Sequence, residues 1–150
     1  MAKEKAKIAV IILNWNQTDL TLACLKSVFQ SRTDGQIEIE AIVVDNGSTD
    51  DSKKRLKEIQ EKRNLFRQGR DEIEILRSKF PNFKVIFNKE NLGFAGGNNV
   101  GIRYALKNKA DFIFILNNDT EIKNDCVLNL WQTFKEEKKI GIASPKIYYA

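Results

Sequence analysis

Asp119 is the residue whose type and position point most directly to chemistry. It ends the polar cluster Asn117-Asn118-Asp119, which directly follows an apolar run. A Mg²⁺ or Mn²⁺ ion bound together with a diphosphate takes one or two protein carboxylates, while phosphate oxygens and water complete its coordination. Asp119 could supply such a carboxylate, and the uncharged Asn117 is better suited to a hydrogen bond with a sugar hydroxyl. The alternative interpretation is a polar turn that only leads into the next helix.

A second carboxylate, Asp45, also ends an apolar run, and the turn residues Asn46-Gly47-Ser48-Thr49 follow it. Its side chain could accept a hydrogen bond from a nucleobase N–H group or from a ribose hydroxyl. The alternative interpretation is that Asp45 only holds the turn at residues 47–49 together.

The stretch from Leu92 to Gly101 holds four of the eight glycines of the chain. A helix that begins inside this stretch would offer its N-terminal amides to an anion. The stretch is not a P-loop, because no Gly-Lys-Ser/Thr follows, and it is not a Gly-x-Gly-x-x-Gly dinucleotide motif. Close packing of the helix on a sheet is the alternative explanation for these glycines.

The composition excludes several kinds of chemistry. The chain has no histidine, so serine–histidine catalysis, cysteine–histidine catalysis and histidine-bound metals are excluded. Cys24 and Cys126 lie far apart, which predicts buried thiols in a reducing compartment rather than a zinc site. Acid–base chemistry or metal binding must therefore use carboxylates.

The charge and hydropathy patterns predict a cytoplasmic protein. No apolar run approaches the ~20 residues of a membrane span, and the run at Ile8–Leu13 is too short for a signal peptide. The net charge of +5 fits a solvated surface, with a peripheral contact at the inner face of the membrane as the alternative. No basic stripe is interleaved with aromatic residues, so nucleic acid is not an expected partner.

Five short apolar runs predict the strands that position these residues, and helical patterns lie between them. The runs are rich in β-branched residues, and most do not alternate, which is typical of buried parallel strands. The predicted fold class is therefore α/β, a mainly parallel sheet with helices on both faces. Four of the five runs end in a polar cluster, so these clusters should share one edge of the sheet. The predicted strands are Ile8–Leu13, Ile37–Val44, Lys84–Phe87, Ala110–Leu116 and Ile140–Ser144.

The helices are predicted from caps and apolar spacing. One helix follows a cap at Asn16 or Thr18, and a second runs from about Asp51 to Arg63. A third spans roughly Asn98–Asn108, and the last lies behind a cap at Asn124 or Asp125. The charged stretch Arg63–Phe80 is predicted to be a surface helical excursion. A contact with a partner or a membrane surface is the alternative for that stretch.

Four motifs, taken together and in order, resemble those of family 2 glycosyltransferases, most closely the rhamnosyltransferase-like branch. The resemblance covers nearly the whole chain, from Lys7 to Tyr148. The motifs are Ile11-Ile12-Leu13-Asn14-Trp15-Asn16, Val43-Val44-Asp45-Asn46-Gly47-Ser48-Thr49-Asp50, Asn88–Gly101 and Leu116-Asn117-Asn118-Asp119.

The resemblance implies a GT-A fold and inverting transfer of a sugar from a nucleotide-diphosphate donor to a glycan or lipid-linked acceptor. It implies that Trp15 and Asp45 contact the base and that Asn117, in the first position of the family's Asp-x-Asp motif, lies at the ribose. Asp119 would bind a Mg²⁺ or Mn²⁺ ion that bridges the diphosphate. The segment from Gly93 to Asn99 would line the nucleotide pocket.

The resemblance also implies that residues 1–150 are the nucleotide-sugar-binding part of a catalytic domain. Family members continue further, and their later part carries an acidic general base, so we expect the base beyond Ala150 and no catalytic residue within the chain. A sugar nucleotidyltransferase is one alternative function, although the segment after the first strand lacks that class's glycine-rich basic loop. A non-catalytic nucleotide-binding module is the other alternative. The sequence does not identify the sugar, the nucleobase of the donor or the oligomeric state.

Overall fold

The computed structural model describes residues 5–61 and 83–148. Its centre is one sheet of four parallel strands in the order β3-β2-β1-β4. Apolar runs form the two central strands, which are buried along most of their length. The strands are β1 (Ala6–Asn14), β2 (Ile37–Asp45), β3 (Phe83–Phe87) and β4 (Phe112–Asn117).

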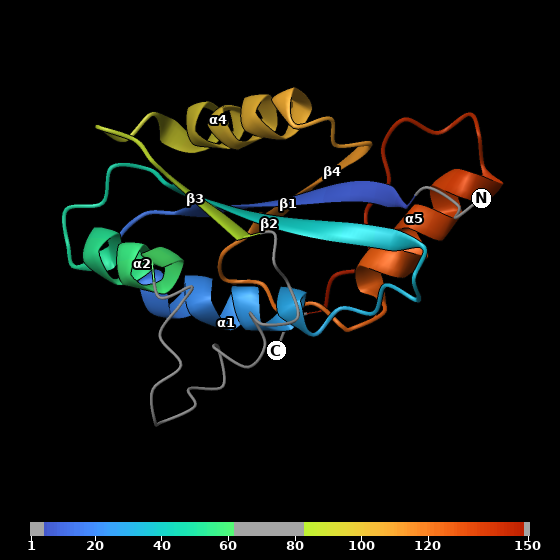
Figure 1. Ribbon diagram of the computed structural model, residues 1–150, viewed down its shortest axis with the longest axis horizontal. Coiled ribbons are helices and arrows are strands. Elements are labelled where there is room, and N and C mark those ends of the chain that lie inside the picture. Colours follow the sequence, from blue (N-terminus) through green and yellow to red (C-terminus); the bar gives the residue numbers. More distant parts are fainter. Residues whose placement is uncertain (1–4, 62–82, 149–150) are drawn as a thin grey trace.

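Helices cover both faces of this sheet, as the sequence predicts for a parallel α/β fold (Figure 1). One helix lies on one face, and the other three pack on the opposite side, with α5 toward the end where β4 begins (Figure 1). The helices are α1 (Thr18–Phe29), α2 (Ser52–Glu61), α4 (Gly93–Lys107) and α5 (Cys126–Glu136).

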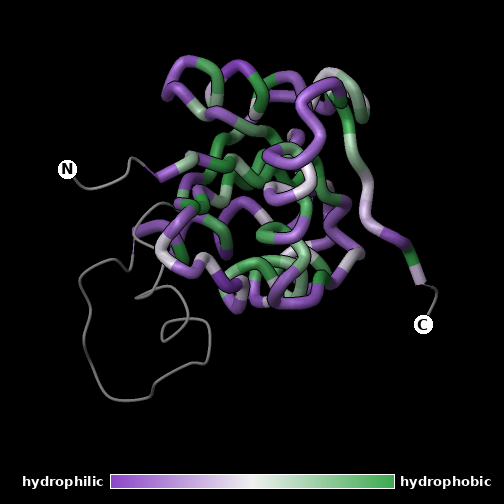
Figure 2. The backbone as a smooth tube through the Cα atoms, turned by 90° about the vertical axis from the view of Figure 1, so that its right-hand side faces the viewer, coloured by the Kyte–Doolittle hydropathy of each residue, from purple (hydrophilic) through white to green (hydrophobic). Residues whose placement is uncertain are grey.

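The core has two parts, one on each face of the sheet, because successive strand residues point to opposite sides. In β1, Val10 and Ile12 pack with α1 and α5, while Ala9 and Ile11 pack beneath α4. In Figure 2, hydrophobic segments of the backbone lie toward the inside of the molecule, and hydrophilic ones lie mostly at its surface. Both faces of the sheet are thus occupied, and its strand ends are left to carry polar groups.

The glycines of α4 let this helix lie close to the sheet. A Cβ atom on Gly97 would lie 2.4 Å from Leu13 Cδ1, and one on Gly101 would lie 2.7 Å from Ile11 Cγ2. Close helix–sheet packing is therefore an actual role of the glycine-rich stretch. The helix begins at Gly93, five residues before the predicted start at Asn98, because tertiary packing overrides the low helix propensity of glycine.

The predicted fifth strand at Ile140–Ser144 is wrong. In the described part of the chain these residues pair with no strand, and Ile142 is 91% exposed. Without a neighbouring strand or buried surface, nothing offsets the entropy lost in ordering an extended segment. The predicted excursion at Arg63–Phe80 lies outside the described residues.

Candidate functional site

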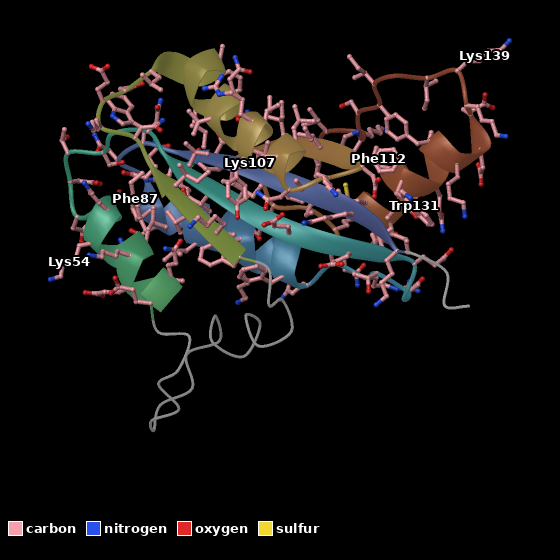
Figure 3. The ribbon with its side chains drawn as sticks, turned by 45° about the horizontal axis from the view of Figure 1, so that its top comes forward. Lys54, Phe87, Lys107, Phe112, Trp131 and Lys139 are labelled. Atoms are coloured by element: carbon pink, nitrogen blue, oxygen red, sulfur yellow. The ribbon has the colours of Figure 1, made fainter. Side chains whose placement is uncertain are left out.

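The strand register brings the predicted site residues to one edge of the sheet. Asn14 pairs with Asp45 across β1 and β2, and Leu13 pairs with Asn117 across β1 and β4. The strands are parallel, so their carboxyl ends meet at this edge. In Figure 3, Phe87 marks the carboxyl end of β3, and Phe112 marks the opposite, amino end of β4. We call the side of the sheet on which the four strands end the carboxyl edge.

Asp45 is completely buried at the end of β2. Its Oδ1 atom accepts hydrogen bonds from Asn14 Nδ2 at 2.8 Å and from Ser48 Oγ at 2.5 Å. Its Oδ2 atom is buried and has no hydrogen-bond partner among the described residues. A buried carboxylate oxygen without a partner is costly, so it marks a place for an incoming donor. The bond with Ser48 also confirms that Asp45 holds the following turn together.

Trp15 follows β1 directly and is 51% exposed, so its indole is available at the carboxyl edge. The next residue, Asn16, has a φ of +54°, a left-handed conformation that asparagine tolerates better than most residues. Asn16 does not cap α1 as predicted. Its Oδ1 accepts a hydrogen bond from the backbone N–H of Thr49 at 2.8 Å, which ties the ends of β1 and β2 together.

Asn46 connects the end of β2 to the loop that leads into α4. Its Nδ2 donates to Asn91 Oδ1 at 2.8 Å and to the carbonyl of Gly93 at 3.1 Å. Its Oδ1 accepts from Asn88 Nδ2 at 2.9 Å and from the backbone N–H of Leu92 at 3.1 Å. Four hydrogen bonds on one side chain fix Gly93 at the carboxyl edge, at the start of α4.

Asn99 lies exposed in the second turn of α4, beside a residue that the sequence analysis included in the segment Gly93–Asn99 but did not single out. That residue, Asn98, is buried and donates its Nδ2 to the carbonyl of Phe94 at 3.0 Å. Its Oδ1 is buried without a partner among the described residues. Asn98 is therefore as strong a candidate for a polar ligand contact as Asn99.

The chain at the end of β4 presents Asn117, the last residue of the strand, and Asp119 to solvent. It turns sharply, because the backbone N–H of Thr120 donates to the carbonyl of Asn117 at 3.1 Å. Between the two exposed side chains, Asn118 points its Nδ2 atom at Thr21 Oγ1, 3.2 Å away in α1. The Asp119 carboxylate is thus exposed on the same edge of the sheet as Asp45.

The side chains available as metal ligands fit a cation that is shared with a diphosphate rather than one held by protein alone. Within residues 5–61 and 83–148, no group of three or more His, Cys, Asp or Glu side chains could hold a metal ion. A single exposed carboxylate at Asp119, with phosphate oxygens and water as the other ligands, suits Mg²⁺ or Mn²⁺.

Negative charge gathers around this segment. The thiol of Cys24 in α1 lies 3.6 Å from the carbonyl oxygen of Asn117. Burial, together with the negative charges of Asp119 and Glu121, raises the pKa of the Cys24 thiol to about 12. Two carboxylates therefore act electrostatically on one point beside the end of β4. Glu121, which is exposed, was not among the predicted site residues.

Several other residues of the site were missed by sequence reasoning. The side chains of Asn14, Thr21, Asn46 and Asn118 form its internal hydrogen bonds. Asn14, Asn46 and Asn118 stand in the polar clusters at the strand ends, which was the available signal for them, while Thr21 is a polar residue inside a helix with an apolar stripe.

A comparison with protein-family models identifies the chain. The model for glycosyl transferase family 2 matches residues 9–149. The chain belongs to glycosyl transferase family 2. This agrees with the resemblance of its four motifs, while the rhamnosyltransferase-like branch stays a prediction. No curated protein sequence matches the chain significantly.

Solved structures share the fold, which is the GT-A fold of this family. The structure of S. aureus TarS residues 1–349 is similar with a TM-score of 0.64 and 20% identity, over 93% of this chain and 38% of that one. A TarS structure in complex with UDP-GlcNAc has the same TM-score and identity. The mannosyltransferase PcManGT from Pyrobaculum calidifontis, in complex with GDP-Man and Mn²⁺, has a TM-score of 0.63 and 17% identity, over 89% of this chain and 33% of that one. The chain thus spans well under half of each of these structures.

A search of the described residues for membrane spans found no helix with the length and apolar character that crossing a bilayer requires.

Proposed function

We propose that this chain is the nucleotide-sugar-binding part of a glycosyltransferase that transfers a sugar from a nucleotide-diphosphate donor, with inversion and with the help of Mg²⁺ or Mn²⁺. The observation that carries the proposal is the exposed Asp119 carboxylate on the same edge of the sheet as Asp45. Family membership supports the transfer reaction. TarS bound to UDP-GlcNAc and PcManGT bound to GDP-Man and Mn²⁺ support the donor class and the cation.

In this proposal the nucleobase of the donor lies at Trp15 and Asp45. The exposed indole offers a face for stacking, and Asp45 Oδ2 offers an acceptor for a base N–H group. Because Oδ2 is shielded from solvent, the base must displace a covering group when it binds. Asn117 contacts the ribose, and the segment from Gly93 to Asn99 borders the nucleotide.

Asp119 holds the metal ion at the diphosphate. The bound cation supplies charge neutralisation for the departing nucleoside diphosphate. We assign no general base to the described residues, since Asp45 is engaged in hydrogen bonds and Asp119 is assigned to the cation. The acceptor is proposed to be a glycan or a lipid-linked saccharide, as the family resemblance implies.

Titration calorimetry with the full chain tests the proposal. UDP, GDP and dTDP are titrated with and without Mn²⁺ into the wild type, Asp119→Asn and Asp34→Asn. Asp34 is the matched control, because it is another exposed carboxylate and lies between α1 and β2, at the opposite edge of the sheet. We expect Mn²⁺ to strengthen nucleotide binding at least tenfold in the wild type and in Asp34→Asn, and to have little effect in Asp119→Asn.

Three outcomes would contradict the proposal. Equal Mn²⁺ dependence in Asp119→Asn and the wild type would remove the metal assignment. Release of pyrophosphate from a nucleoside triphosphate and a sugar phosphate would favour a nucleotidyltransferase. No affinity for any of the three nucleotides would favour a module without this activity.

A further inference from the structure

Three buried polar side chains of α1 lie three residues apart and all contact the segment that carries Asp119. Thr21, Cys24 and Ser27 occupy one side of the helix because residues at this spacing lie above one another. Thr21 Oγ1 accepts from Asn118 Nδ2 at 3.2 Å, and Cys24 Sγ lies 3.6 Å from the carbonyl of Asn117. Ser27 Oγ accepts from the backbone N–H of Ile122 at 3.1 Å. We call these three residues the α1 seam.

Such polar groups are costly in a buried helix face unless they are hydrogen-bonded. The exposed fraction is 0% for Thr21 and Cys24 and 5% for Ser27, and each has a partner in the segment 117–122. Thr18 lies on the same side one turn earlier and is also buried, but its hydroxyl has no partner among the described residues. The contacts with 117–122 therefore distinguish the seam from an incidental polar stripe.

Thr21 also connects this segment to Asp45. A hydroxyl has one proton to donate, and Thr21 Oγ1 donates it to Asn14 Oδ1 at 2.7 Å. Asn14 in turn donates its Nδ2 to Asp45 Oδ1 at 2.8 Å. Because the proton of Thr21 is committed to Asn14, the hydroxyl can meet Asn118 only as an acceptor. The hydrogen bonds thus run in one direction from Asn118 through Thr21 and Asn14 to Asp45.

This chain of bonds joins three strand ends through one helix. It starts beside Asp119 after β4, crosses α1, passes the end of β1 and finishes at the end of β2. Inside a protein, hydrogen bonds in series strengthen one another, and a shift at one end changes the geometry at the other. Among the described residues, Asn118 Nδ2 has one other acceptor, Gln17 Oε1, at a longer 3.4 Å.

We propose that Thr21 is a positioning residue that couples the nucleotide contact at Asp45 to the metal contact at Asp119, while Cys24 and Ser27 hold the same segment against α1. This inference rests on the proposed function. When the base binds at Asp45, the chain of hydrogen bonds holds Asn118 in place, and Asp119 is fixed where the diphosphate and its cation arrive. By linkage, the factor by which a bound nucleotide strengthens cation binding equals the factor by which a bound cation strengthens nucleotide binding.

The coupling is measured as the ratio of nucleotide affinities with and without Mn²⁺, in calorimetry on the full chain. The probe is whichever of UDP, GDP or dTDP binds the wild type most tightly. Thr21→Val removes the hydroxyl and keeps the shape of the side chain. We expect it to lower the ratio about fivefold, which corresponds to one lost hydrogen bond, with the metal-free affinity within about twofold of the wild type.

Two variants serve as controls. Thr18→Val makes the same change on the same side of the helix, at a hydroxyl without a partner in the described residues, and should keep the wild-type ratio. Thr21→Ser restores the hydroxyl and should also keep it. A merely structural role of Thr21 would alter stability without changing the ratio.

Asn118→Ala breaks the same link from the other end and should lower the ratio as much as Thr21→Val does. It lies in a partly exposed segment, so it tests the coupling even if Thr21→Val fails to fold. The double variant should lower the ratio no further than either single variant, because both remove one interaction. An unchanged ratio in Asn118→Ala would overturn the inference. A wild type whose nucleotide affinity does not depend on Mn²⁺ would instead overturn the proposed function.

Discussion

Gly47 is the position where a single methyl group should test the organisation of the site most sharply. Its φ is +73°, and a Cβ atom there would lie 2.4 Å from the carbonyl carbon of Glu90 and 2.7 Å from its Cα. The loop before α4 therefore rests directly on the Gly47 backbone. Gly35 is a matched control, because its φ is +70° and a Cβ atom would meet nothing within 4 Å.

The expected losses follow from these two geometries. The left-handed conformation costs an alanine about 1–2 kcal/mol, and this cost applies to both positions. Overpacking adds about 1–3 kcal/mol, and only at Gly47 do backbone atoms stand in the way. We expect Gly35→Ala to lower the free energy of unfolding by about 1–2 kcal/mol. Gly47→Ala should lower it by about 2–5 kcal/mol, with a difference of about 2 kcal/mol between the variants.

Urea unfolding followed by tryptophan fluorescence measures both free energies. Displacement of the loop should also break the bonds that Asn88 and Leu92 make to Asn46, so nucleotide affinity should fall in Gly47→Ala and not in Gly35→Ala. Equal free energies of unfolding in the two variants, with equal nucleotide affinity, would refute the account of Gly47 as the support of this loop.

Two further predictions concern buried groups. Asp45→Asn keeps an oxygen for Asn14 and Ser48, so we expect a free energy of unfolding within about 1 kcal/mol of the wild type. Nucleotide affinity should be at least about tenfold weaker, because the proposed acceptor for the nucleobase is lost. Urea unfolding and calorimetry measure the two effects separately, and an unchanged affinity would disprove the contact with the nucleobase. The pKa of the Cys24 thiol is about 12 in the folded chain and ordinarily 9.0, so the folded state holds this proton more tightly. Its contribution to stability is complete below pH 9 and is lost as the pH rises toward 12, at about 1.4 kcal/mol per pH unit. Urea midpoints from pH 8 to 10.5 should therefore fall more steeply in the wild type than in Cys24→Ala, and parallel slopes would count against this account.

The strands that the sequence predicts correctly are those in which burial dominates. The apolar run at Ile8–Leu13 is uninterrupted, and Ile37–Val44 alternates before it becomes continuous at Ala41–Val44; such runs are stable between two helical layers, and both became central strands. Because parallel strands end at a common edge, the polar residues after them could be placed together from the sequence alone. This logic located Asp45, Asn117 and Asp119 at one edge.

The remaining features depend on partners that a sequence does not show. Ile140–Ser144 has the composition of a strand, but a strand forms only where another strand pairs with it. The start of α4 at Gly93 depends on contacts with the sheet that outweigh propensity. The bond between Asn118 and Thr21 joins residues 97 positions apart, and nothing in the local sequence pairs them. The internal connections of the site were missed for this reason.

The strand order has a consequence for how the chain folds. β1 is made first and lies in the middle of the sheet, yet its neighbour on one side is β4, and the backbone of Lys7 bonds with Asp111, 104 positions later. During synthesis one side of β1 must therefore keep its amide and carbonyl groups unpaired until most of the chain has emerged. Such distant parallel pairing is slow, and the waiting apolar edge invites aggregation. We expect nascent chains to need chaperone protection until β4 docks, and ligand binding to appear only in that final step.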